Sequence, residues 1–208
     1  MKVDTSGEKE LWEGVVHLFE DKEKVLGPVS SKLFLSEPQK MSNFFSRYKF
    51  LAKMICKKKK ILELGCGEAL GSTLISEYSA EYLGVDREEE SISIAEKNWK
   101  SHKCRFIAEE FLGKSFGCFD AVVAFNLLER LELHEETVLF ETIRVNLDKG
   151  GICALCVRNE GKFVEKVAIG MEMLFYNVLT FTICNGCVHS GRESFCGEDL
   201  LFLGCYRR

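Results

Sequence analysis

The sequence lacks an excess of basic residues. Its 208 residues include 28 lysines and arginines against 32 aspartates and glutamates, so the formal net charge is -4 and the pI is near 5.7. Proteins bind a polyanion such as DNA or RNA mainly through a basic surface. The charge balance therefore disfavours a nucleic-acid partner.

Long apolar runs are also missing. No stretch approaches the roughly 20 apolar residues that are needed to span a bilayer, and residues 1–10 contain no apolar core of a secretory signal. We therefore predict no membrane partner, and we expect the protein in the cytoplasm. Hydrophobic residues make up 46% and charged residues 29% of the chain, which is typical of a folded globular protein.

Cysteine, in contrast, is abundant, with ten residues. A cytosolic chain of this length does not need disulfide bonds, so we interpret most of these cysteines as small buried hydrophobic residues. Cys184, Cys187 and His189 lie close together in the sequence, but three ligands without a fourth fall short of a structural zinc site. Cys153 and Cys156 should point to opposite faces of a strand. We therefore predict no metal site.

The first 56 residues are predicted to form a helical N-terminal cover. Apolar residues recur with helical spacing over 7–20 and 43–56. Between these helices, residues 27–39 contain both prolines and several serines, which is typical of a loop. Residues 57–208 should form the main domain, and the whole chain should fold as one compact unit.

From residue 57 onward, short apolar runs alternate with helical segments, which indicates an α/β fold with a doubly wound, mostly parallel sheet. Strands are predicted near 60–64, 81–85, 104–107, 119–125 and 151–157. Helices are predicted near 70–78, 89–100, 134–147 and 162–175, and residues 148–151 should form a turn. Two further strands, 176–184 and 199–205, should pair antiparallel across a loop.

A glycine-rich turn follows the first predicted strand. Gly65 and Gly67 leave room for a ligand over the turn, and Gly71 allows the next helix to pack closely. A dinucleotide fingerprint would place its third glycine at Leu70. This spacing disfavours a nicotinamide-dependent oxidoreductase.

Carboxylates cluster around this turn. Asp86 ends the second predicted strand, where it can accept both hydroxyls of a ribose. Glu109 and Glu110 follow the third strand, close to where an adenine amino group would lie. With Glu63, these groups would repel a pyrophosphate but suit a cofactor that carries a sulfonium cation and no phosphate.

The ordered motifs E-L-G-C-G-E-A-L-G, G-V-D, F-D-A-V-V-A-F-N-L-L-E-R-L and L-D-K-G-G-I resemble those of class I S-adenosylmethionine-dependent methyltransferases. The resemblance covers residues 60–157 directly and implies a seven-stranded sheet whose last strand is antiparallel. It also implies that S-adenosyl-L-methionine is the cofactor. The residues expected to form the cofactor site are Glu63, Gly65, Cys66, Gly67, Gly71, Asp86, Glu109, Glu110 and Asn126. The sequence departs from the family at Glu109 and Glu110, where relatives commonly have a small residue and an aspartate.

The resemblance places the reacting methyl group near residues 126–131. Relatives often carry a Glu-His pair there, but Arg130 occupies the histidine position in this chain. Asn126, Glu129 and His189 are the candidate catalytic residues, with Glu129 or His189 as the general base. Glu129 and Arg130 could instead pair at the start of the next helix.

The acceptor is predicted from weaker signals. No N-P-P-Y or D-P-P-Y sequence follows the fourth strand, so a small-molecule acceptor is the default prediction. The segment 175–191 is weakly similar to small bacterial methyltransferases associated with surface-glycan genes, which suggests a sugar or glycan precursor. Trp12, Phe19 and Tyr48 are candidates for covering the site. The alternative is a catalytically silent relative that binds the cofactor or a protein partner.

Overall fold

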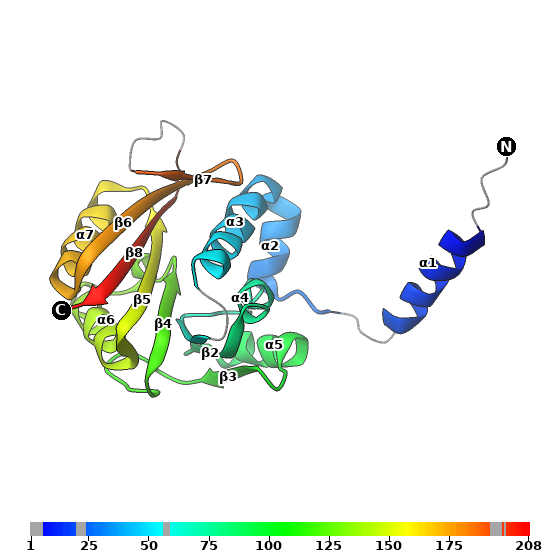
Figure 1. Cartoon of the computed structure of the whole chain (residues 1–208), viewed down its shortest axis with the longest axis horizontal. Coiled ribbons are helices and arrows are strands. Elements are labelled where there is room, and N and C mark those ends of the chain that lie inside the picture. Colours follow the sequence, from blue (N-terminus) through cyan, green and yellow to red (C-terminus); the bar gives the residue numbers. More distant parts are fainter. Residues whose placement is uncertain (1–5, 20–23, 56–58, 192–196, 198) are drawn as a thin grey trace.

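The computed structural model describes residues 6–19, 24–55, 59–191, 197 and 199–208. Eight strands form one sheet in the order β3-β2-β1-β4-β5-β8-β6-β7, with helices packed on both faces (Figure 1). The five strands of the first half are all parallel: β1 (Lys59–Leu64), β2 (Ser79–Asp86), β3 (Cys104–Ala108), β4 (Phe119–Phe125) and β5 (Leu147–Arg158). This confirms the doubly wound α/β fold.

Three strands complete the sheet: β6 (Phe175–Cys184), β7 (Cys187–Ser190) and β8 (Asp199–Arg207). Strand β8 inserts antiparallel between β5 and β6, so the predicted antiparallel pair is present. The predicted count of seven strands was one too low. Asn185 and Gly186 both have positive φ and form a two-residue turn, which folds the following residues back onto β6 as an edge hairpin.

Helices alternate with the parallel strands as the sequence pattern predicted. The helices of the main domain are α4 (Ser72–Ser76), α5 (Glu89–Trp99), the short 3-10 helix η1 (Leu128–Arg130), α6 (Leu133–Asn146) and α7 (Gly161–Leu174). Helix α4 is shorter than predicted. The predicted turn at residues 148–151 lies within β5, which already starts at Leu147 opposite Phe119. The register then jumps to Ala121 opposite Ile152, so the extra residues are in β5.

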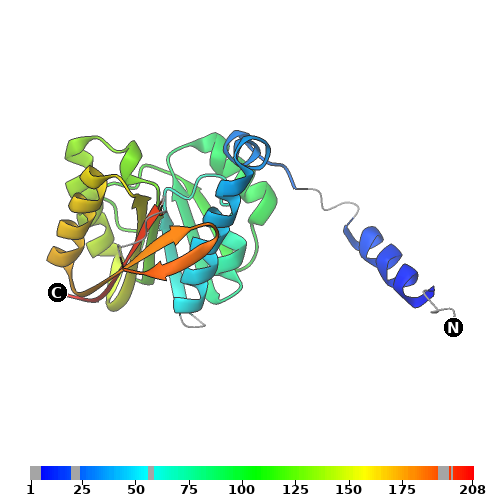
Figure 2. The ribbon, with the colours of Figure 1, turned by 90° about the horizontal axis from the view of Figure 1, so that it is seen from above.

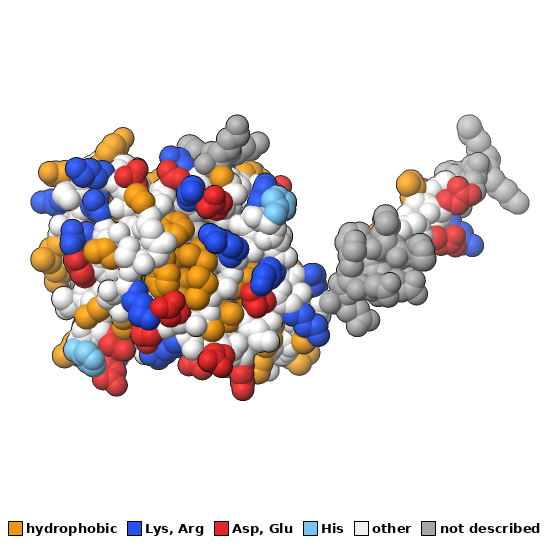
Figure 3. Space-filling model, turned by 90° about the horizontal axis from the view of Figure 1, so that it is seen from below, with side chains coloured by type: hydrophobic (Ala, Val, Ile, Leu, Met, Phe, Trp, Pro, Cys, Tyr) orange, Lys and Arg blue, Asp and Glu red, His pale blue; other side chains and the backbone are white. Residues whose placement is uncertain are grey.

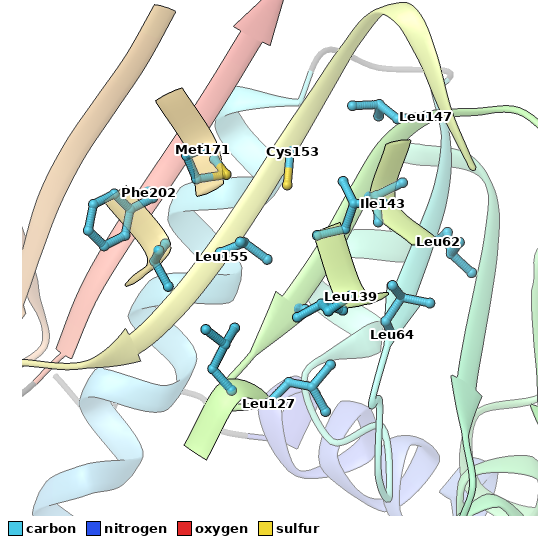
Figure 4. Close-up of a cluster of buried hydrophobic side chains, with 14 of the residues drawn as sticks. Leu62, Leu64, Leu127, Leu139, Ile143, Leu147, Cys153, Leu155, Met171 and Phe202 are labelled. Carbon is cyan, nitrogen blue, oxygen red and sulfur yellow. The ribbon is translucent and has the colours of Figure 1, made fainter. Parts of the chain in front are cut away.

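The core has two parts, one on each face of the sheet. Helices α6 and α7 cover the first, where Leu139, Ile143 and Met171 pack against sheet residues such as Leu155 and Phe202 (Figure 4). The second lies under the helices that precede and follow β1. Cys153 belongs to the first part and Cys156 to the second, which confirms that they point to opposite faces.

The N-terminal region contains three helices: α1 (Ser6–Phe19), α2 (Pro28–Ser36) and α3 (Pro38–Met54). The loop predicted for residues 27–39 was wrong. Each proline occupies the first turn of a helix, where a missing backbone N–H is no loss and the fixed φ favours the helical conformation.

Helix α1 differs from the other two because it stands apart from the sheet (Figures 1 and 2). Leu11, Trp12 and Val15 are exposed, so the described part of its predicted apolar face is not packed against the sheet. The side chain of Phe19 lies outside the described part of the chain.

One cysteine departs from the expectation that the chain does not need disulfide bonds. Cys184 is disulfide-bonded, whereas seven other described cysteines are free, and four of these are buried. Within the described segments, no helix has the length and apolar character required to cross a membrane. On the face seen in Figure 3, basic and acidic side chains are interspersed rather than gathered by sign.

Candidate functional site

A cleft of about 880 Å³ lies at the carboxyl ends of β1, β2, β4 and β5. Helices α2 and α3 form its other wall. This is the edge at which doubly wound sheets bind ligands, since the loops that follow parallel strands meet there. The sequence predicted this location from the order of strands and acidic turns.

The glycine loop forms part of the floor. Gly65 and Gly67 have φ angles of 70° and 53°, which favour glycine, and the N–H of Gly65 donates to the carbonyl of Val85 at 2.8 Å. A Cβ on Gly67 would meet nothing within 4 Å, so the space above it is open. Cys66 also lines the cleft. Gly71 does not, and a Cβ there would lie 2.4 Å from the Tyr48 ring.

Asp86 lies beside this loop at the end of β2. Its carboxylate accepts hydrogen bonds from the N–H groups of Gly67, at 2.7 Å, and Glu88, at 3.0 Å. The residue is only 9% exposed but lines the cleft. Because a carboxylate has about four acceptor positions, it can hold the loop and still accept from two hydroxyls.

Glu63 lies behind the loop rather than in the cleft lining. Its carboxylate accepts from the phenol groups of Tyr48, at 2.6 Å, and Tyr82, at 2.5 Å, and the side chain is buried. Desolvation raises the pKa of Glu63 to about 7, although the two phenol hydrogen bonds oppose the shift. Glu63 therefore joins helix α3 to strands β1 and β2.

Glu68 is a site residue that the sequence analysis missed. Its carboxylate accepts from the N–H groups of Val29 and Ser30, both at 2.9 Å, at the first turn of α2. A helix N-terminus leaves such donors unsatisfied and favours a negative charge. Glu68 therefore attaches the cover helix to the glycine loop. The only signal in the sequence was that Glu68 is an acidic residue within the glycine-rich motif and that no basic residue follows it closely as a partner.

Arg47 is the second missed residue. It is buried in α3, where its guanidinium contacts the rings of Phe44 and Phe125 and donates to Asn126 Oδ1. Asp199 lies 3.8 Å away. Burial opposes its charge but the surrounding groups outweigh this, so its pKa is raised. In the sequence, the available signal for Arg47 was its position on the apolar side of the helical pattern over residues 43–56.

Asn126 is the predicted residue that Arg47 holds. It follows β4, has a φ of 50° and lines the cleft. Asparagine tolerates this left-handed conformation better than most residues. Gly65, Cys66, Gly67, Asp86 and Asn126 are thus the predicted site residues that the structure brings together in the cleft lining.

The remaining predicted residues lie elsewhere. Glu109 pairs with Lys114 and Glu110 accepts from the Leu112 N–H, and neither lines the cleft, whereas Phe111 does. Glu129 Oε1 accepts from the Arg158 N–H at 2.7 Å, outside the lining. His189 is exposed on the edge strand β7.

Comparison with known proteins agrees with this geometry. A family model described as a methyltransferase domain matches residues 55–190. No curated protein matches the chain by sequence. The chain belongs to the methyltransferase-domain family, and it is an S-adenosylmethionine-dependent methyltransferase.

Solved structures share the fold. One is a TehB-like S-adenosylmethionine-dependent methyltransferase from Corynebacterium glutamicum, 16% identical, with a TM-score of 0.65 over 86% of this chain and 100% of that chain. The N-methyltransferase NodS from Bradyrhizobium japonicum is 15% identical, with a TM-score of 0.63 over 83% and 99%. The tRNA (m1A58) methyltransferase TrmI from Aquifex aeolicus is 18% identical, with a TM-score of 0.62 over 78% and 68%.

The lining fits the family's cofactor. The open space above Gly67 leaves room for an extended part of the cofactor on the loop. The Asp86 carboxylate keeps acceptor positions for further hydrogen bonds. The cofactor is S-adenosylmethionine, as the sequence predicted.

Proposed function

We propose that this enzyme methylates an oxygen or nitrogen of a small molecule bound in the cleft, with a sugar or glycan precursor as the first class to test. The observation that carries the proposal is the cleft itself. The cleft has a volume of about 880 Å³ and lies between the sheet edge and the cover helices α2 and α3. Such a volume is in the range of small-ligand sites, and it can hold the cofactor with a small acceptor.

Within this proposal, the cofactor contacts follow the lining. Asp86 would hold the ribose, while Gly65, Cys66 and Gly67 would lie against the methionine end. Phe111 lines the same cleft as Asp86 and is buried, which supports an adenine contact there, whereas the predicted contacts Glu109 and Glu110 lie outside the cleft lining.

S-adenosylmethionine supplies a methyl group on a sulfonium, whose positive charge disappears on transfer. The methyl–sulfur bond breaks, a bond from the methyl group to the acceptor forms, and a proton leaves the acceptor. We propose that the protein contributes mainly alignment, which is worth a large part of such barriers. Asn126 lies in the lining and is held by Arg47, which supports an orienting role.

Glu129 and His189 stay the predicted general bases. Glu129 accepts from the Arg158 N–H through Oε1, and its Oε2 is buried without a hydrogen-bond partner outside the cleft lining. Glu129 can serve only if Oε2 becomes accessible to the acceptor. His189 can serve only if the acceptor extends toward the hairpin of β6 and β7.

Calorimetry with S-adenosylhomocysteine on wild type and on Asp86→Ala tests the cofactor part of the proposal. We expect micromolar binding by wild type and a loss of at least about 100-fold in the variant, because two charge-assisted hydrogen bonds disappear, each contributing about 1.5–3 kcal/mol. Asp148→Ala, on an exposed carboxylate, is the matched control. Equal affinity in wild type and Asp86→Ala would contradict the assigned contact.

An acceptor screen on the same protein then tests the substrate class. Methyl transfer to sugars or other small molecules but not to tRNA or protein would support the proposal. Transfer only to a macromolecule would refute it.

A further inference from the structure

Charges are distributed unevenly along the cleft. The end beside the glycine loop is lined by three carboxylates and one cation: Glu68, Asp86, Glu88 and Arg87. The rest of the charged lining consists of five cations and three carboxylates: Lys32, Lys40, Arg47, Arg130, Arg158, Glu37, Glu160 and Asp199. Positive charge is therefore in excess in this part of the lining, which includes Arg130 in the turn that follows β4.

The carboxylate of Glu37 lies close to several of these cations. Glu37 Oε1 lies 3.1 Å from the Lys40 ammonium and 3.8 Å from that of Lys32. The pKa of Glu37 is lowered mainly by the hydrogen bond from Lys40, and the charges of Lys32 and Arg158 lower it further. Because Lys32 and Lys40 share Glu37, this carboxylate does not compensate both ammonium charges.

The two arginines are held at neighbouring strand ends. Arg130 follows β4 and Arg158 ends β5, and these strands pair directly, with Phe125 opposite Cys156. Glu129, next to Arg130, accepts from the backbone N–H of Arg158. This bond ties the two turns together.

Both guanidinium groups are available to a ligand. Arg130 is exposed and makes no ion pair with any residue that the structure describes. Arg158 lies 3.7 Å from Glu160, but both side chains are largely exposed, so this pair is weak. An incoming anion can therefore compete for both groups.

We propose that the methyl acceptor carries an anionic group, a carboxylate or a phosphate, which Arg130 and Arg158 bind at the outer end of the cleft. The inference rests on the proposed function and narrows its substrate class. A guanidinium binds either group through two parallel hydrogen bonds. The acidic pI and the mixed charges on the face seen in Figure 3 favour a small anion over a nucleic acid.

The test uses the full-length protein saturated with S-adenosylhomocysteine. Inorganic phosphate and benzoate are titrated separately at constant ionic strength, with chloride as the reference, and binding is followed by NMR chemical shifts. We expect at least one anion to bind saturably. Arg130→Gln and Arg158→Gln should each weaken it about tenfold, because each removes a charge-assisted contact.

Arg105→Gln is the matched control, because Arg105 is exposed on the far strand β3. It should bind the anion as wild type does. The stronger of the two ligands identifies phosphate or carboxylate as the recognised group. If neither anion binds better than chloride, or if Arg105→Gln weakens binding as much as Arg130→Gln and Arg158→Gln do, the inference is overturned.

Binding of S-adenosylhomocysteine by the same samples separates the two proposals. If wild type binds it but no anion, only the anionic acceptor fails. If a folded wild type does not bind it, the proposed function itself fails.

Discussion

The two faces of the sheet bury different kinds of side chain. Under α6 and α7 the core is almost wholly apolar (Figure 4). The polar residues there, Thr142 and Asn146, are engaged in holding the backbone of residues 113–116. Under α3, the buried groups include the ionisable side chains of Arg47, Glu63 and Tyr82.

Because of this difference, we expect the two faces of the sheet to contribute differently to stability and to ligand binding. Burying ionisable groups costs free energy that apolar packing does not. The polar groups under α3 lie directly beneath the glycine loop and Asn126, where they position the floor of the cleft. We therefore expect substitutions under α6 to change mainly stability, and those under α3 to change both stability and cofactor binding.

The largest effect is expected at Leu139, which is fully buried in α6. Leu139→Ala should lower the free energy of unfolding by roughly 4 kcal/mol, because it removes apolar contacts and leaves a cavity. Urea denaturation measures this change. The control is Leu133→Ala in the same helix, where the side chain is 75% exposed and the change should be small.

The comparison also requires that Leu139→Ala bind S-adenosylhomocysteine as wild type does when both are folded. A clear loss of affinity at a temperature where the variant is folded would break the division between the faces.

The second effect concerns pH and Glu63. Its folded pKa of about 7 lies above the ordinary 4.5, so the folded state holds the proton more tightly than the unfolded state. Its contribution to stability is therefore complete below pH 4.5 and is lost as the pH rises to about 7, by roughly 3 kcal/mol. Tyr48, Tyr82, Arg47 and Asp86 are the titratable groups that act on it.

Glu63→Gln removes this titration while keeping the shape of the protonated side chain. The difference in unfolding free energy between the variant and wild type should shift in favour of the variant between pH 5 and pH 8. Glu81→Gln, on an exposed carboxylate of β2, should show no such shift. A pH-independent difference for Glu63→Gln would mean that Glu63 does not titrate in this range.

The smallest effect is expected at Glu68, which caps α2. Glu68→Ala should lower the unfolding free energy by about 1 kcal/mol, the usual size for a lost N-cap. Hydrogen exchange at Val29 and Ser30 should accelerate, because their N–H groups lose their acceptor. Glu90→Ala, on an exposed residue of α5, is the control and should leave exchange in α2 unchanged.

Affinity for S-adenosylhomocysteine should also weaken in Glu68→Ala but not in Glu90→Ala, since Glu68 joins α2 to the glycine loop. Unchanged affinity would show that the cover moves independently of the cofactor site.

The sequence by itself determined the fold class, the strand-end site and the cofactor. Short apolar runs that alternate with helical segments specify a parallel sheet. A glycine turn followed by Asp86 indicates a ribose site, and this inference needs only the local spacing of the residues. Helices at 7–20 and 43–56 were predicted from the same periodicity, yet α3 packs on the sheet and α1 does not. Periodicity shows that a helix has an apolar face, but not what covers it.

Only the tertiary structure decided which polar groups meet. Tyr48 and Tyr82 reach Glu63 from different elements, Arg47 meets Asn126 across 79 residues, and Glu68 caps a helix that lies 38 residues upstream. The edge strand β7 likewise depended on pairing with β6. Contacts between distant segments depend on how the elements pack, and no local pattern of residues encodes that packing.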